Sequence, residues 1–73
     1  MDRTTETYRG YTLHSEALQQ RDSSGKWSGS YVIFKGDVEV ARASVAGPLD
    51  SETEAADNAS RIARERVDQL IDG

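Results

Sequence analysis

The stretch WSGSYVIFKGDVEVARA, residues 27–43, decides the fold, because two apolar runs flank the dipeptide Gly36-Asp37. Both runs are rich in Trp, Tyr, Val, Ile and Phe, which are enriched in strands. A two-residue connection with glycine first favours a type II′ turn, whose twist matches that of the flanking strands. We therefore predict a β-hairpin with strands at residues 26–35 and 38–45.

The sequence on either side of the hairpin predicts one more strand and its boundaries. Residues 10–20, GYTLHSEALQQ, alternate imperfectly between apolar and polar side chains, which indicates a strand. The polar DSSG at 22–25 is typical of a loop. Ala46-Gly47-Pro48 should end the last strand, since proline cannot donate to the ladder. Residues 1–7 are polar and aperiodic, so we expect a flexible tail there and one domain at 8–73.

The last third of the chain predicts a single helix. Ser51 and Glu54 have the spacing of a capping box, and acids precede the first apolar turn. Apolar side chains recur at steps of three and four, at Ala55, Ala56, Ala59, Ile62, Ala63, Val67, Leu70 and Ile71. Three i,i+4 pairs are expected on the polar face: Asp57–Arg61, Arg61–Glu65 and Arg64–Asp68. A helix of about 21 residues is roughly 31 Å long and can cover a sheet face.

These elements predict an α+β fold, a three-stranded antiparallel meander with one C-terminal helix packed on one face (β-β-β-α). The hairpin turn and a four-residue first loop sort the side chains into two sets. We expect the helix to cover Tyr11, Leu13, Ala17, Val32, Phe34, Ala41, Ala43 and Val45. The opposite face should carry His14, Leu18, Trp27, Tyr31, Ile33, Val38, Val40 and Arg42. A bulge or a different first loop would exchange the faces.

Composition restricts the classes of function. The chain has 73 residues, a net charge of −4, one histidine and no cysteine. The acidic balance disfavours a general nucleic-acid binder. The absence of cysteine removes disulfides and thiolate metal sites, and it fits a reducing compartment. No apolar run is long enough to span a membrane, and the N-terminus does not resemble a signal peptide. We therefore expect a cytoplasmic protein, and self-association is the remaining way to stabilise so small a domain.

The sequence offers little catalytic chemistry. His14 is the only histidine, and although Glu16 lies two residues away, a surface pair explains both residues better than a catalytic one. The acids at Asp50, Glu52 and Glu54 are better explained by helix capping than by a metal. The glycines lack phosphate-loop spacing. We expect no enzymatic activity, no metal and no cofactor.

The apolar face left uncovered by the helix is the candidate functional site. Its members are Trp27, Tyr31, Ile33, Val40 and Arg42, with His14 on the neighbouring strand. Trp, Tyr and Arg dominate protein–protein hot spots, which favours a self-associating interaction module, most simply a homodimer. The alternative is a weak single-stranded nucleic-acid binder that stacks bases on these aromatics.

Short motifs along most of the chain resemble a group of small bacterial proteins of unknown function. The matching positions are Gly10-Tyr11-Thr12-Leu13, Gly25-Lys26-Trp27, Leu49-Asp50-Ser51, Glu54-Ala55 and Ile71-Asp72. The group carries Phe and Thr where this chain has Leu49 and Ser51, and it implies no activity. The β-β-β-α order is also similar to a double-stranded-RNA-binding domain without its first helix, and to some antitoxins, which bind a partner protein. Fold analogy of this kind does not imply function.

Overall fold

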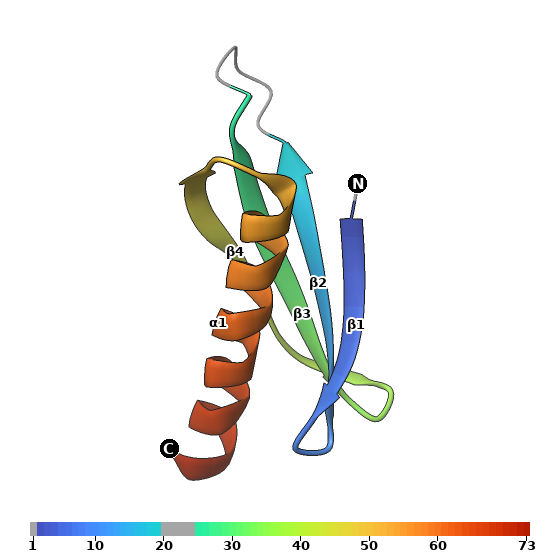
Figure 1. Cartoon of the computed structure of the whole chain (residues 1–73). Helices are drawn as coiled ribbons and strands as arrows, with labels where there is room; N and C mark the ends of the chain where they lie inside the picture. Colours follow the sequence, from blue (N-terminus) through green and yellow to red (C-terminus); the bar gives the residue numbers. More distant parts are fainter. Residues whose placement is uncertain (1, 20–24) are drawn as a thin grey trace.

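The protein is an antiparallel sheet with one helix across it, seen in a computed structural model that describes residues 2–19 and 25–73 (Figure 1). The elements are β1 (Asp2–Tyr8), β2 (Tyr11–Gln19), β3 (Trp27–Lys35), β4 (Val38–Leu49) and α1 (Glu52–Asp72). The strands lie in the order β1-β2-β3-β4. The predicted α+β class with an antiparallel sheet and a C-terminal helix is confirmed. The prediction of three strands is wrong, because the sheet has four.

The additional strand is β1, formed by residues that we expected to be a flexible tail. It pairs antiparallel with β2, with Thr5 opposite His14 and Tyr8 opposite Tyr11. Its threonines are β-branched and favour strands. Arg9 and Gly10 connect the two strands with φ angles of 51° and 85°. Positive φ at both central residues is the requirement of a type I′ hairpin turn.

The second hairpin forms at the predicted position. Lys35 lies opposite Val38, and Gly36 has a φ of 62° while Asp37 has no positive φ. A positive φ at the first position only distinguishes the predicted type II′ turn from type I′. The predicted end of this hairpin at residue 45 is wrong, because β4 continues to Leu49. An edge strand can contain a proline, since its outward groups need no partner strand.

Two register differences change which side chains share a face. Leu13 lies opposite Ile33 rather than the predicted Phe34. The predicted first loop falls largely in residues 20–24, outside the described residues. In the second hairpin, Phe34 pairs with Glu39 but Ile33 pairs with Ala41, so Val40 is an extra residue in β4. This bulge exchanges the faces of the β4 residues beyond it relative to β3, whereas the changed partner of Leu13 exchanges the faces of β3 itself.

The helix consequently covers a different set of β3 side chains from the one predicted. The prediction is right for β2, where Tyr11, Leu13 and Ala17 are buried. It is wrong for β3, where the helix covers Tyr31 and Ile33, and where Val32 and Phe34 lie on the opposite face, only half-buried. The core beneath α1 consists of Tyr11, Leu13, Tyr31, Ile33, Val45, Ala59, Ala63 and Val67.

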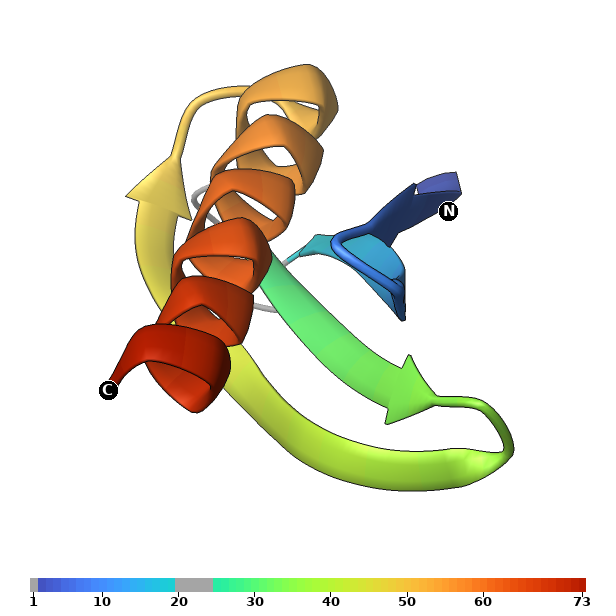
Figure 2. The ribbon, with the colours of Figure 1, turned by 90° about the horizontal axis from the view of Figure 1, so that it is seen from below.

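The helix begins as its sequence predicts, and most of its predicted apolar stripe is buried, although Leu70 and Ile71 are exposed. The Glu54 amide donates to Ser51 Oγ at 3.1 Å, and the Glu54 carboxylate in turn accepts from the Asp50 amide at 3.3 Å. The buried helix residues are Ala55, Ala56, Ala59, Ala63 and Val67. Four of these five are alanines, which let the helix axis approach the sheet closely. Figure 2, seen from below, shows α1 lying along the sheet while β4 curves past its side.

Candidate interaction surface

The six residues predicted to form one surface lie in three different places. Trp27 packs against the buried cluster of Ala17, Ala55 and Ala56 on the helix side. Also on that side, Tyr31 is 6% exposed and Ile33 is fully buried. His14 and Arg42 lie on the opposite face, and Val40 is the extra residue of the bulge. A base-stacking platform of Trp27, Tyr31 and Arg42 is therefore not formed.

The sheet face opposite α1, which we call the uncovered face, carries a mixture of apolar and polar side chains. Register places Thr5, Thr7, Thr12, His14, Glu16, Leu18, Ser28, Ser30, Val32, Phe34, Glu39, Arg42 and Ser44 on it. His14, Val32 and Phe34 are half-buried by their neighbours, and Leu18 is 40% exposed. Within the described ranges 2–19 and 25–73, no helix or further strand lies over this face.

His14 and Phe34 form the aromatic centre of the uncovered face. Their ring centroids are 5.5 Å apart and their planes meet at 83°. The edge-to-face arrangement is a favourable one for aromatic pairs. The Thr5 hydroxyl lies 3.1 Å from His14 Nδ1. These contacts hold the imidazole in place and do not connect it to Glu16, so the structure gives His14 a packing role on this face.

Charged side chains border the aromatic centre on the β4 side. Arg42 donates through Nε to Glu39 Oε2 at 3.0 Å, and its Nη2 bonds the other carboxylate oxygen. This pairing lowers the pKa of Glu39 and raises the pKa of Arg42. A hollow of about 420 Å³ is lined in part by Glu16, Ser30, Val32, Arg42 and Ser44, which lie on this face. The uncovered face thus combines an apolar centre with both signs of charge at its border.

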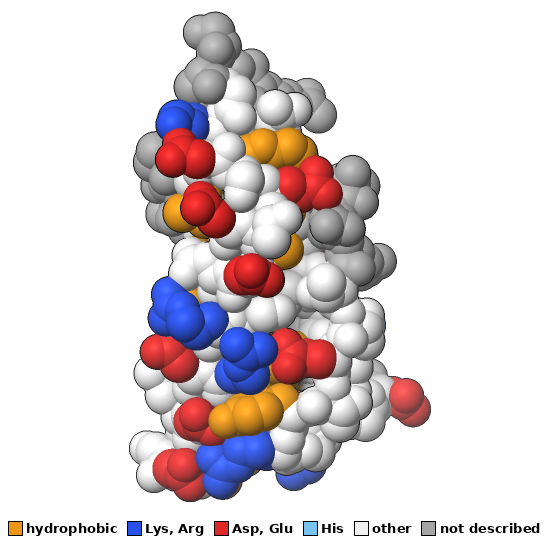
Figure 3. Space-filling view, viewed as in Figure 1, with side chains coloured by type: hydrophobic (Ala, Val, Ile, Leu, Met, Phe, Trp, Pro, Cys, Tyr) orange, Lys and Arg blue, Asp and Glu red, His pale blue; other side chains and the backbone are white. Residues whose placement is uncertain are grey.

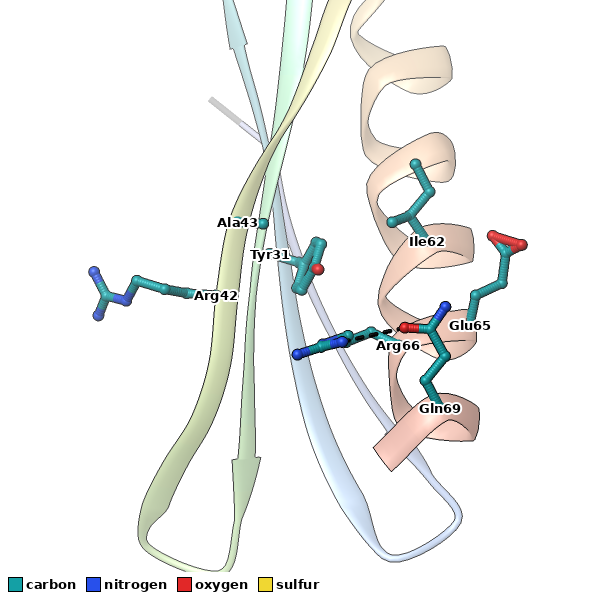
Figure 4. A pocket seen from close by; sticks show the side chains of 7 residues that line it. All are labelled: Tyr31, Arg42, Ala43, Ile62, Glu65, Arg66 and Gln69. Atoms are coloured by element: carbon teal, nitrogen blue, oxygen red, sulfur yellow. Dashed lines mark hydrogen bonds between the residues drawn. The ribbon is translucent and has the colours of Figure 1, made fainter. Parts of the chain in front are cut away.

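A second hollow lies on the other side of β4, between that strand and the C-terminal half of α1. This β4–α1 cleft has a volume of about 420 Å³ and is lined by Tyr31, Arg42, Ala43, Ile62, Glu65, Arg66 and Gln69. Figure 4 shows Tyr31, Ile62 and Arg66 directed into the space between strand and helix, whereas Arg42 points away from the helix. Arg66 Nη1 donates to Gln69 Oε1 at 3.1 Å. Sequence reasoning missed this cleft, because it depends on the buried placement of Tyr31.

Ion pairs connect β1 and its turn to the end of the helix. Arg9 donates to Asp68 at 2.8 Å and to Asp72 at 3.1 Å, and the Tyr8 hydroxyl donates to Asp68 at 3.0 Å. A separate pair joins Arg64 to Glu6 at 3.0 Å. We call these six residues the β1–α1 cluster. The predicted Arg64–Asp68 pair is replaced by these contacts, whereas the predicted Arg61–Glu65 pair forms at 2.9 Å.

The surface of α1 is divided by charge. In Figure 3, acidic side chains lie over the N-terminal half of the helix, and basic and acidic side chains alternate over the C-terminal half. The first-turn acids, Glu52 and Glu54, lie close to the positive end of the helix dipole. This pattern matches a solvated, ion-paired helix face.

The β1–α1 cluster predicts a pH-dependent contribution to stability from Asp68. Hydrogen bonds from Arg9 and then Tyr8 lower the pKa of Asp68 below its ordinary value of 3.8. A lowered folded-state pKa adds stability above the unfolded-state pKa, and this stability is lost as the pH falls through the folded-state value. Asp68→Asn should therefore be less stable than the wild type at neutral pH, with the difference shrinking below about pH 4. Urea unfolding of both proteins across this range measures it, and a difference independent of pH would contradict the role given to the carboxylate.

Two kinds of feature are absent from the described part of the chain, a metal-binding cluster and a membrane-spanning helix. Among the residues that the structure describes, no group of three or more His, Asp or Glu side chains is placed to hold a metal ion. Within the same residues, no helix is both long and apolar enough to cross a membrane.

Comparison with known proteins does not identify a family for this chain. No family model matches the chain, and neither a curated protein nor a solved structure matches it. The function is therefore argued from the two surfaces alone.

Proposed function

We propose that the protein is a small non-enzymatic interaction module that self-associates through the uncovered face. The observation that supports this is the one-sided cover of the sheet. Helix α1 buries Leu13 and Ile33, while Phe34 and Val32 alternate onto the face that no other described element covers. An apolar centre with a polar border is the usual anatomy of a protein contact surface.

A second copy of the chain is the occupant that we favour. A chain of 73 residues buries a smaller share of its surface than a larger domain does, and without cysteines it has no disulfides to compensate. Four strands of about nine residues present roughly 570 Å² in projection, comparable to the roughly 800 Å² per partner of a standard interface. The face carries Glu16 and Arg42 together, so two copies related by a two-fold axis can oppose unlike charges.

Sedimentation equilibrium over a range of protein concentrations tests this proposal. The wild type should show a concentration-dependent approach to the dimer mass, and Phe34→Ser should remain monomeric because it removes the apolar centre. Leu70→Ser is the control, since Leu70 is an exposed large apolar side chain that lies on the helix and not on the uncovered face. This variant should dimerise like the wild type. A wild type that stays monomeric at millimolar concentration, or a Phe34→Ser protein that dimerises normally, would contradict the proposal.

A further inference from the structure

We infer that the β4–α1 cleft binds an extended peptide segment as a fifth strand, with a carboxylate of that segment held by Arg66. This site is separate from the uncovered face, and it would accept a different partner: an extended chain with an apolar side chain and an acidic side chain two residues apart.

The first support is the free edge of β4. It is the last strand of the sheet, so its outward backbone N–H and C=O groups have no neighbouring strand in the described structure. Residues 41–45, ARASV, lie between the two register shifts of the β3–β4 ladder and pair regularly with β3. They contain no proline, and their one charged side chain, Arg42, is paired with Glu39 and points away from the helix. An edge of this kind is a template for strand addition.

The second support is the wall that α1 builds beside this edge. A strand added about 4.8 Å outside β4 would direct every second side chain to the helix side of the sheet. There it would meet the Tyr31 ring and Ile62, with Ala43 small enough to leave space between them. The cleft volume of about 420 Å³ falls in the range of roughly 300–1,000 Å³ that is typical of ligand sites.

The third support is the charge at the end of the cleft. Four other arginines of the described chain each contact a carboxylate: Arg9, Arg42, Arg61 and Arg64. Arg66 instead donates to the neutral amide of Gln69, and among the described side chains it forms no ion pair. Glu65, the acid that also lines the cleft, is held by Arg61 at 2.9 Å. A guanidinium with a neutral partner, directed into a cleft that also contains Tyr31 and Ile62, is suited to bind a carboxylate bidentately.

Two synthetic peptides test the inference. The first, Thr-Val-Thr-Asp-Thr-Val-Thr with blocked termini, places valine and aspartate on one face, and the second has lysine in place of aspartate. Both are titrated into the full chain while amide chemical shifts are recorded by NMR. The aspartate peptide should shift the amides of residues 41–45 and the Arg66 side chain, and should bind about tenfold more tightly than the lysine peptide, as expected for a charge-assisted hydrogen bond.

A charge exchange separates specific recognition from general attraction. Arg66→Glu should reverse the preference, so that the lysine peptide binds more tightly, because the new carboxylate attracts the lysine ammonium group. The exposed position tolerates the change. Lys35→Glu, an equal charge change at an exposed position outside the cleft, should keep the preference for aspartate. The inference fails if neither peptide binds, if the shifts map to β1 or to His14, Val32 and Phe34 of the uncovered face, or if Arg66→Glu leaves the preference unchanged. It also fails if β4 amides become protected with protein concentration alone, which would assign this edge to a second copy.

Discussion

Replacing Gly29 by valine should strongly lower the free energy of unfolding of the protein. A Cβ atom at this position would lie 2.7 Å from the backbone oxygen of Ala55 and 3.0 Å from Ala59 Cβ. The first contact is with helix backbone, which cannot move aside without displacing α1 from the sheet. Overpacking of a core usually costs about 1–3 kcal/mol in stability. The two further methyl groups of valine place the expected loss in the upper part of this range or above it. For a small domain with a stability of about 5 kcal/mol, such a loss is a large fraction of the total.

Urea unfolding followed by far-ultraviolet circular dichroism measures this effect. Ser30→Val is the matched control, because Ser30 is the next residue of β3 and faces away from the helix. It should have a free energy of unfolding close to that of the wild type. Equal stability of Gly29→Val and Ser30→Val would contradict the close packing of α1 on β3.

Replacing Ile33 by alanine should destabilise the protein far more than replacing its neighbour Phe34 by alanine. Ile33 is fully buried between sheet and helix, whereas Phe34 is half-buried on the uncovered face. Truncation of a buried isoleucine to alanine typically costs about 2–5 kcal/mol through lost transfer free energy and the cavity that remains. Phe34 has the larger side chain but is therefore expected to contribute less than Ile33 to the free energy of unfolding. Side-chain size alone would suggest the opposite.

This pair of variants also decides between the two possible registers of β3. The free energies of unfolding are compared by urea titration at a protein concentration at which the wild type is monomeric, so that dimerisation does not contribute. If Phe34→Ala were the more damaging variant, the helix would cover the face that sequence reasoning predicted, and the register in the structure would be wrong.

The helix and the second hairpin are the parts of the fold that the sequence predicts well. Both depend on local signals. The Ser51 cap and the spacing of Ala55, Ala59, Ala63 and Val67 determine the start and the buried face of α1, because they act within a few helical turns. Gly36 likewise determines its own turn, since a positive φ is required at that residue.

The strand register could not be predicted because it depends on non-local packing. The pairing of Leu13 with Ile33 instead of Phe34 exchanges the faces of β3, and the extra residue Val40 then keeps Ala41, Ala43 and Val45 of β4 on the predicted helix side. One residue of slippage is enough to move Tyr31 from the surface to the core. The strand β1 is not predicted for a different reason: its residues are polar and lack an apolar alternation, although Thr4, Thr5 and Thr7 are β-branched and favour strands.

The candidate site was only partly predictable, because it depends on the register. The sequence predicts that α1 leaves one sheet face uncovered, and no described element covers the face opposite α1. His14 and Arg42 lie on that face. Phe34 was assigned to the wrong face together with the rest of β3. The cleft residue Arg66 was interpreted as part of an ion-paired helix face, and its position beside β4 became visible only once β4 was placed along the helix.

Chemical-shift mapping of the wild type during dilution tests the central proposal most directly. Amide shifts are recorded by NMR from millimolar to micromolar protein, without any ligand. Self-association through the uncovered face predicts that the largest changes occur at His14, Val32, Phe34 and Arg42, while the buried helix positions Ala59 and Ala63 remain unchanged. Changes confined to the β1 edge or to α1, or no changes over the whole range, would contradict it.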